Sequence, residues 1–339
     1  MSDRPFVSVV IPTCNRRAIL GRCLAALAGQ TYRPFEVIVV DDGSMDDTPQ
    51  YLACFAADHP DMMFRRFRNE PQIGANPSRN LGIRESRGVY VAFADDDCIA
   101  APDWLEKLTA GFVSDRVAAV TGRVDDPAPT NLYELTHKGT HRVHGRVHAT
   151  RLVAGNMCVR RDLLARYRLD EDRAAICRDR TVSGRGDEEG LFLSLRAAGY
   201  EQRVAHDAVV VHEHGYTARS FVRQAYRSGR SAARLGYKYY LPPRIELVPL
   251  LCAYLTVPLA GCGVVRWALP AVLAGVFLAA ILYNDFLRKR KTSIETLITL
   301  PWLLVYYHLR LAGYVLEHFR LWFGRPEIQR VRLSRPQRM

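Results

Sequence analysis

The chain has 339 residues, of which 48% are apolar, and its formal net charge is +12. This composition excludes a disordered or fibrous protein, because a chain with this many apolar residues can bury a large core. Its length fits one large or two medium domains. Residues 284–339 carry eleven basic and four acidic side chains, so more than half of the excess positive charge lies there. A basic segment of this kind requires an anionic partner or surface.

The cysteines and the N-terminal segment indicate the cellular compartment of the protein. Eight cysteines are scattered along the chain without a CxxC pair. We interpret them as reduced, buried thiols, because neither a disulfide framework nor a zinc-ligand spacing is present. The apolar stretch 7–11 is too short for a secretory signal. We therefore expect the first domain to begin in the cytoplasm.

Short β-branched segments alternate with helical patterns in the first third of the chain. The expected strands are residues 7–11, 35–40, 62–67, 89–94 and 117–121. One intervening helix has an apolar stripe from Ile19 to Leu27, and another begins near Pro102. This alternation is typical of a parallel α/β sheet. Ligands of such sheets bind beyond the carboxyl ends of the strands, so the loops at those ends are the candidate sites.

Three carboxylates, Asp95, Asp96 and Asp97, directly follow the expected strand 89–94. Their mutual repulsion is unfavourable unless a cation offsets it, and oxygen ligands suit Mg²⁺ or Mn²⁺ holding a diphosphate. The alternative is a solvated turn with a helix cap.

The ends of two other expected strands are also polar. Asp41 and Asp42 follow the strand 35–40, where a carboxylate can accept hydrogen bonds from a base or ribose. The first strand leads into a polar turn that offers backbone groups and a cation, formed by Pro12, Thr13, Cys14, Asn15 and Arg16. No GxGxxG or GxxxxGKS pattern occurs, which argues against a dinucleotide enzyme and a P-loop ATPase.

Together these segments resemble the family 2 glycosyltransferases, of the membrane-associated bacterial type, which have the GT-A fold. The matching segments, in order, are VSVVIPTCNR (7–16), VIVVDDGSMDDT (37–48), GANPSRNLGI (74–83), VAFADDDC (91–98) and GNMCVRR (155–161). The resemblance runs from about residue 6 to 235. It implies an α/β nucleotide-diphospho-sugar transferase fold with a Rossmann-like, mostly parallel sheet.

The resemblance also implies roles for individual residues. Asp95 and Asp97 would form the metal pair, with Asp97 as the direct ligand of Mn²⁺ or Mg²⁺. Arg79 and Asn80 would lie near the diphosphate. Some GT-A enzymes complete the metal site with a histidine, so His212 is a candidate third ligand, although an ordinary surface histidine is an equal alternative.

One motif departs from the family pattern. The family usually has Gly-Glu-Asp before an amphipathic helix, with the Asp as catalytic base, whereas this chain has Gly186, Asp187, Glu188 and Glu189. By position Glu188 takes the role of the base, and Asp187 or Glu189 are the alternatives. These acids would also suit the first turn of any helix, where the macrodipole favours them.

Two basic clusters lie outside the recognised motifs. Histidines at helical spacing occur at 137, 141, 144 and 148, and we expect a cationic acceptor loop there rather than a metal site. Arginines at 219, 223, 227, 230 and 234 fall on one expected helix. We expect them to face lipid headgroups or a lipid diphosphate, and a solvated helix face is the alternative.

Residues 247–283 contain a single charge, Arg266. The stretch fits two membrane crossings, 247–265 and 268–283, and the basic run 288–291 would hold both ends on the cytoplasmic side. A buried helical pair in a soluble domain is the alternative. The next apolar segment, 297–316, carries His308 and Arg310, so we expect it to lie on the inner leaflet as an amphipathic helix.

These expectations define three regions. A catalytic domain is expected over 1–240, with a nucleotide-sugar-binding half at 1–122 and an acceptor-side half at 123–240. A transmembrane helical hairpin is expected at 241–291, followed by an interfacial helix and basic tail at 292–339.

The expected activity is inverting transfer from a UDP-, GDP- or dTDP-sugar to a lipid-linked or saccharide acceptor, in cell-surface polysaccharide or glycolipid synthesis. It would take place at the cytoplasmic face of the inner membrane, in contact with membrane lipids and without nucleic acid. A non-catalytic nucleotide-binding membrane scaffold that has lost the usual Asp base is the main alternative. A nucleotidyltransferase explains less of the sequence and ranks last.

Overall fold

The computed structural model describes residues 4–138, 149, 151–171, 188–213, 215–239, 252, 265–283 and 292–323. The chain divides into two compact units. The first unit contains the described residues up to 127 and from 149 to 213, and the second contains 128–138 and the described residues from 215 onward.

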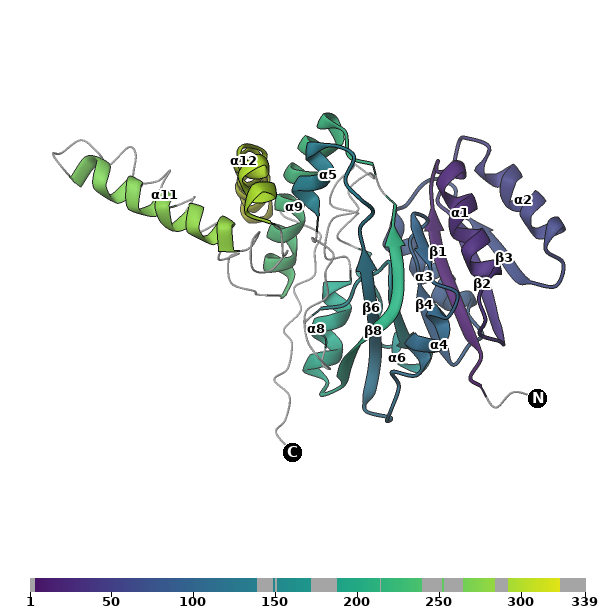
Figure 1. Cartoon of the computed structure of the whole chain (residues 1–339). Helices are drawn as coiled ribbons and strands as arrows, with labels where there is room; N and C mark the ends of the chain where they lie inside the picture. The colour runs from purple at the N-terminus through teal and green to yellow at the C-terminus, as the bar shows by residue number, and fades with distance from the viewer. Residues whose placement is uncertain are drawn as a thin grey trace. The chain divides into compact units, whose positions relative to one another are not determined.

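An eight-stranded sheet forms the centre of the first unit, in the order β3-β2-β1-β4-β7-β6-β8-β5. Figure 1 labels β1, β2, β3, β4, β6 and β8 of this sheet. The strands are β1 Val7–Thr13, β2 Phe35–Asp41, β3 Met63–Arg68, β4 Tyr90–Phe93, β5 Cys98–Ala100, β6 Val117–Asp125, β7 Met157–Arg160 and β8 Glu201–His212. Strands β1 to β4 pair in parallel, as do β6 and β8, whereas β7 and β5 run antiparallel to their neighbours. All five strands expected from the sequence are confirmed.

Helices cover both faces of this sheet. One apolar core includes side chains of α1 (Arg17–Ala28), α2 (Thr48–Asp58) and α4 (Trp104–Thr109). The other includes side chains of α3 (Ala75–Glu85), α6 (Arg161–Leu164) and α8 (Glu189–Ala197). Every residue of β1 and β2 is therefore buried, as expected for strands covered on both faces. The buried residues of α1 (Leu20, Cys23, Leu24 and Leu27) recur at helical spacing.

The second unit is helical. It contains α5 (Leu132–His137), α9 (Ala218–Tyr239), α11 (Val265–Tyr283) and α12 (Ser293–Phe323), and α12 packs against α9 and α5. Between α9 and α12, the carboxylate of Glu317 accepts hydrogen bonds from Arg230 Nε and Arg234 Nε, both at 2.7 Å. All three side chains are buried.

Two expectations about basic residues are corrected here. The expectation of lipid-facing arginines is wrong for Arg230 and Arg234, because a carboxylate distant in sequence pairs with them inside the helix packing. His137 does not lie on an open loop. It ends α5 and is buried against the rings of Tyr216, Phe221 and Tyr306. The three other histidines of that cluster, at 141, 144 and 148, lie outside the described residues.

The expected transmembrane hairpin is not supported. Across the described parts of the chain, no helix combines the length and the apolar character that crossing a membrane requires. A crossing takes about 20 apolar residues. The second expected crossing falls in α11, which has 19 residues with Arg266 in its first turn. The first, 247–265, lies almost wholly outside the described residues.

Candidate active site

The carboxyl ends of β1, β2 and β4 meet at one edge of the sheet, as parallel pairing requires. Two contacts join the three loops that follow these strands. Thr13 Oγ1, at the end of β1, donates to Asp96 Oδ2 at 2.7 Å, and the backbone N–H of Asp42 donates to the carbonyl of Thr13 at 2.8 Å. Pro12 is buried within β1, where it is paired with Val40 of β2. Residues from three predicted segments are thus brought together.

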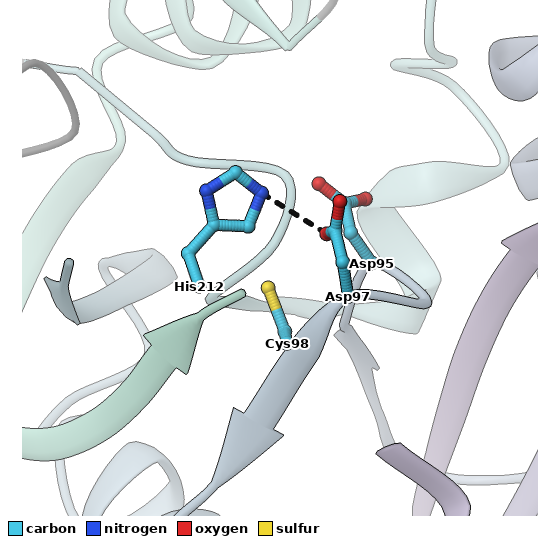
Figure 2. Close-up of side chains that lie close together, drawn as sticks. All are labelled: Asp95, Asp97, Cys98 and His212. Atoms are coloured by element: carbon cyan, nitrogen blue, oxygen red, sulfur yellow. Dashed lines mark ion pairs between the residues drawn. The ribbon is translucent and has the colours of Figure 1, made fainter. Parts of the chain in front are cut away.

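Asp96 and Asp97, which follow β4, lie close to the guanidinium of Arg16 and the imidazole of His212. Arg16 Nη1 lies 2.6 Å from Asp96 Oδ1 and 2.8 Å from Asp97 Oδ2. His212 Nε2, at the end of β8, lies 3.0 Å from Asp97 Oδ1 (Figure 2). Asp96 and Asp97 are only 4% and 5% exposed, so these partners offset charges that water barely reaches.

Burial and neighbouring charges shift the pKa values of Asp96 and Asp97 in opposite directions. Burial raises the pKa of Asp96 to about 6, although Arg16 opposes this shift. Burial acts in the same direction on Asp97, but His212 and Arg16 outweigh it and hold the pKa of Asp97 well below its ordinary value. For His212, burial lowers the pKa, but the hydrogen bond and charge of Asp97 raise it above the ordinary value. Asp97 is therefore the more acidic carboxyl of the pair, because it is paired with both His212 and Arg16.

Arg79 and Asn80 lie next to each other on α3 but face different surroundings. Arg79 Nη2 lies 2.5 Å from Asp95 Oδ1, and its Nη1 donates to Asn76 Oδ1 at 3.1 Å. Asn80 Nδ2 instead donates to the carbonyl of Leu169 at 2.8 Å. Arg79 thus joins the aspartate cluster, whereas Asn80 fixes the segment after α6.

The carboxylates that follow β2 hold the surrounding loops. Asp42 accepts hydrogen bonds from three donors, namely Asn69 Nδ2 at 3.0 Å, the Ile73 N–H at 2.9 Å and the Gly74 N–H at 2.7 Å. Asp41 accepts from the Ser44 N–H at 3.0 Å and pairs with Arg68 at 2.5 Å.

Asn15 has a positive φ of 54°, and its Oδ1 accepts from the Met45 N–H at 2.7 Å. Asn15, Asp41 and Asp42 therefore hold the loops at this edge of the sheet together. Whether they also touch a nucleotide stays a prediction.

The candidate bases lie at the start of α8. Glu188 occupies the N-cap position and Glu189 the first turn. Asp187 lies outside the described residues. The helix-start position expected as the alternative is therefore observed for Glu188 and Glu189, and it does not exclude a catalytic role. Their role as base remains a prediction.

The residues at the strand ends fit a divalent cation. Asp95, Asp97, Cys98 and His212 each offer one ligand atom, and these atoms all lie within 4.8 Å of one another (Figure 2). Gly155 keeps space open beside them, because a Cβ added there would lie 2.9 Å from Cys98 Sγ and 3.0 Å from Asp95 Oδ2. Carboxylate and imidazole ligands suit Mn²⁺, and carboxylates suit Mg²⁺.

Sequence reasoning missed two members of this site. Cys98 was interpreted only as a buried thiol, although it directly follows the aspartates. Arg68 was not singled out, yet it reaches Asp41 from the end of β3. The pairing of β3 with β2 in parallel register places Arg68 opposite Asp41. A basic residue at the end of the neighbouring expected strand was the available signal.

The mixed α/β sheet, with its acidic strand ends and candidate cation site, has the features of a GT-A-like fold. Comparison with known proteins agrees, since residues 8–167 match the family described as Glycosyl transferase family 2. This match covers slightly less than half of the chain and supports a glycosyltransferase.

A solved structure and curated relatives extend this comparison. The mannosyltransferase PcManGT from Pyrobaculum calidifontis, solved with GDP-Man and Mn²⁺, has a similar fold, with a TM-score of 0.60 and 21% identity over 93% of this chain and 87% of that one. The glycosyltransferase AglE of Haloferax volcanii is 35% identical over 38% of this chain and 42% of its own length.

A β-1,3-glucosyltransferase of Campylobacter jejuni that acts on GalNAc(5)-diNAcBac-PP-undecaprenol is 33% identical over 27% of this chain and 30% of its own length. The matches span less than half the length of these curated relatives.

Proposed function

We propose that this protein is an inverting glycosyltransferase that moves a sugar from a nucleotide-diphosphate donor to a lipid-linked or saccharide acceptor. The observation that carries the proposal is the buried Asp97, which pairs with Arg16 at 2.8 Å and with His212 at 3.0 Å at the carboxyl ends of the strands. The match to family 2 over residues 8–167 supports the same reaction.

Within this proposal, Asp95, Asp97 and His212 would hold Mn²⁺ or Mg²⁺. When bound, the cation would offset the negative charge of the leaving diphosphate. Arg16 and Arg79 add two positive charges at the same place, each already paired with a cluster aspartate. They would bind the diphosphate oxygens and hold the donor in line for attack.

Glu188 is the proposed base that removes the proton of the acceptor hydroxyl, with Glu189 and Asp187 as the neighbouring alternatives. Replacing Glu188 with Gln keeps the side chain's shape and removes the charge. We expect donor binding to persist and sugar transfer to fall strongly. A variant that transfers sugar at the normal rate would remove Glu188 from the mechanism.

The donor and acceptor classes are supported only by similar proteins. The structural neighbour from Pyrobaculum binds GDP-Man, and the Campylobacter relative acts on an undecaprenol-linked saccharide. These names favour a nucleotide-sugar donor and suggest a lipid-linked acceptor for this chain.

The test is nucleotide release from UDP-, GDP- and dTDP-sugars by the full-length protein with Mn²⁺ or Mg²⁺ and with a chelator. We expect one donor to be active and the chelator to silence it. Nucleotide binding without turnover of any donor, even with membrane extract as acceptor, would favour the non-catalytic scaffold.

We also propose that the protein works at the cytoplasmic face of the inner membrane. Support comes from α12, where large apolar side chains are exposed near its C-terminal end: Phe319 by 64%, Trp322 by 66% and Phe323 by 74%. The neighbouring Arg320 is also exposed, and the chain is basic in this region. Exposed aromatic and basic side chains are typical of helices that lie in a membrane surface.

Vesicle flotation tests this localisation. The protein is expected to float with vesicles containing anionic lipid, and replacing Phe319, Trp322 and Phe323 together with Ser should abolish flotation. Met45→Ser, which removes an apolar side chain that is 93% exposed in the first unit, is the matched control. Equal flotation of all three proteins would contradict the proposal.

A further inference from the structure

Cys98 lies inside the cluster that holds the two aspartates and His212. It begins β5 immediately after Asp97, and β5 pairs with β8 in the antiparallel register that sets Cys98 opposite His212. Figure 2 shows the thiol of Cys98 pointing toward the space between the imidazole ring and the carboxylate of Asp97. The pairing of β5 with β8 therefore places Cys98 beside His212.

The spacing of the ligand atoms is compatible with one shared ion. Sulfur and nitrogen ligands bind Zn²⁺ at about 2.3 and 2.0 Å, so two ligands of one ion lie up to roughly 4 Å apart. The atoms of Asp95, Asp97, Cys98 and His212 lie within 4.8 Å of one another, which small side-chain rotations would close. Gly155 leaves the space between Cys98 Sγ and Asp95 Oδ2 open, since a Cβ there would crowd both atoms.

The thiol changes the chemistry of this donor set. Carboxylates alone suit Mg²⁺ and Mn²⁺, whereas a thiolate and an imidazole favour softer ions such as Zn²⁺, Co²⁺ and Cd²⁺. Cys23 provides the contrast, because it is equally buried and near the same loop, with its Sγ 3.6 Å from the carbonyl oxygen of Asp95. Cys23 faces a backbone carbonyl, whereas Cys98 joins the cluster of side-chain ligands.

We propose that Cys98 is a thiolate ligand that enables this site to bind a thiophilic divalent cation together with Asp95, Asp97 and His212. On binding, the sulfur–hydrogen bond breaks, a sulfur–metal bond forms, and one proton leaves to solvent. No electron is transferred. The inference rests on the proposed function only in that the same carboxylates would hold the cation that accompanies the donor, so Zn²⁺ would compete with Mn²⁺ for them.

Cobalt provides the test, because a thiolate bound to Co²⁺ gives a sulfur-to-metal charge-transfer band in the near ultraviolet. Full-length protein is titrated with Co²⁺ and its absorption is recorded. We expect this band in the natural protein and in Cys23→Ser, and its loss in Cys98→Ser. X-ray absorption of the Zn²⁺-loaded natural protein, which requires no variant, should show one sulfur neighbour.

The outcomes separate this inference from the proposed function. Visible cobalt bands or calorimetric binding without a charge-transfer band would overturn the role of Cys98 and leave the carboxylate site intact. A band that persists in Cys98→Ser, with its folding checked by circular dichroism, would also overturn it. If neither Co²⁺ nor Mn²⁺ binds at all, both this inference and the metal-dependent function fail.

Discussion

Replacing Asp97 with Asn tests the metal site most sharply, because the substitution keeps the shape of the side chain and removes its charge. Arg16 Nη1 retains Asp96 at 2.6 Å, so the substitution mainly weakens the contact between His212 Nε2 and the side chain at position 97, which becomes a neutral hydrogen bond. A charge-assisted hydrogen bond contributes about 1.5–3 kcal/mol and a neutral one about 0.5–1.5 kcal/mol. The free energy of unfolding should therefore fall by only about 1–2 kcal/mol.

Metal binding should change far more. Even residues that only support a metal ligand change affinity by about 10–100-fold, so loss of a direct ligand should weaken Mn²⁺ binding by about 100-fold or more, equivalent to about 2.7 kcal/mol. Isothermal titration calorimetry measures the affinity, and urea unfolding measures the stability. Asp103→Asn, at an aspartate whose side chain is 49% exposed beside α4, is the matched control. Unchanged Mn²⁺ affinity in Asp97→Asn would show that Asp97 is not a metal ligand.

Three further predictions concern stability and its dependence on pH. Asp42→Ala leaves three hydrogen-bond donors without their acceptor, at about 1–3 kcal/mol for each buried group, partly relieved by water, so the free energy of unfolding measured in urea should fall by about 2–4 kcal/mol. Asp47→Ala is the control, because the side chain of Asp47 is 68% exposed and its loss should change the stability little. Equal effects of the two substitutions would contradict the role of Asp42. Glu317→Ala leaves Arg230 and Arg234 buried without this carboxylate, so the stability of the helical unit should fall by about 3–5 kcal/mol. Thermal unfolding measures this loss. An unfolding curve equal to that of the natural protein would contradict the pairing. Burial raises the pKa of Glu317, but Arg234 and Arg230 outweigh it and lower this pKa below its ordinary value. The contribution of Glu317 to stability is therefore present above the unfolded pKa of about 4.3 and is lost as pH falls through the lower folded pKa. Glu317→Gln should reduce the loss of stability at acid pH, and an unchanged profile of stability against pH would contradict this.

The sequence predicted the central sheet and the edge that carries the site. Short runs rich in apolar residues, most of them with β-branched side chains, identified all five expected strands. Parallel pairing requires the carboxyl ends of these strands to meet, which explains why Thr13 and Asp96 are in contact. These features depend on local patterns and on one general rule of sheet architecture.

Contacts that depend on long-range register were not predictable in the same way. His212 and Cys98 meet because a short strand after the aspartates pairs antiparallel with β8, and β5 has only three residues. A strand this short leaves no alternating pattern in the sequence. His212 was proposed as a ligand from the resemblance, but its neighbour Cys98 was not.

The second unit shows the same limit. The spacing of the arginines on α9 predicted an amphipathic helix correctly, yet it did not reveal which face would be buried. Glu317 decides this, because it lies 83 residues beyond Arg234 and offers the carboxylate that makes burial of two guanidinium groups tolerable.

Transfer of a labelled sugar is the direct assay for metal-dependent glycosyl transfer by this protein. The natural protein and Asp97→Asn are each given the active nucleotide-sugar, Mn²⁺ and a membrane-derived acceptor, and both the released nucleotide diphosphate and the labelled product are measured. We predict equal amounts of nucleotide and product from the natural protein, none with a chelator, and a loss of at least about 100-fold in the variant. Transfer that persists in Asp97→Asn or in the presence of the chelator would contradict it.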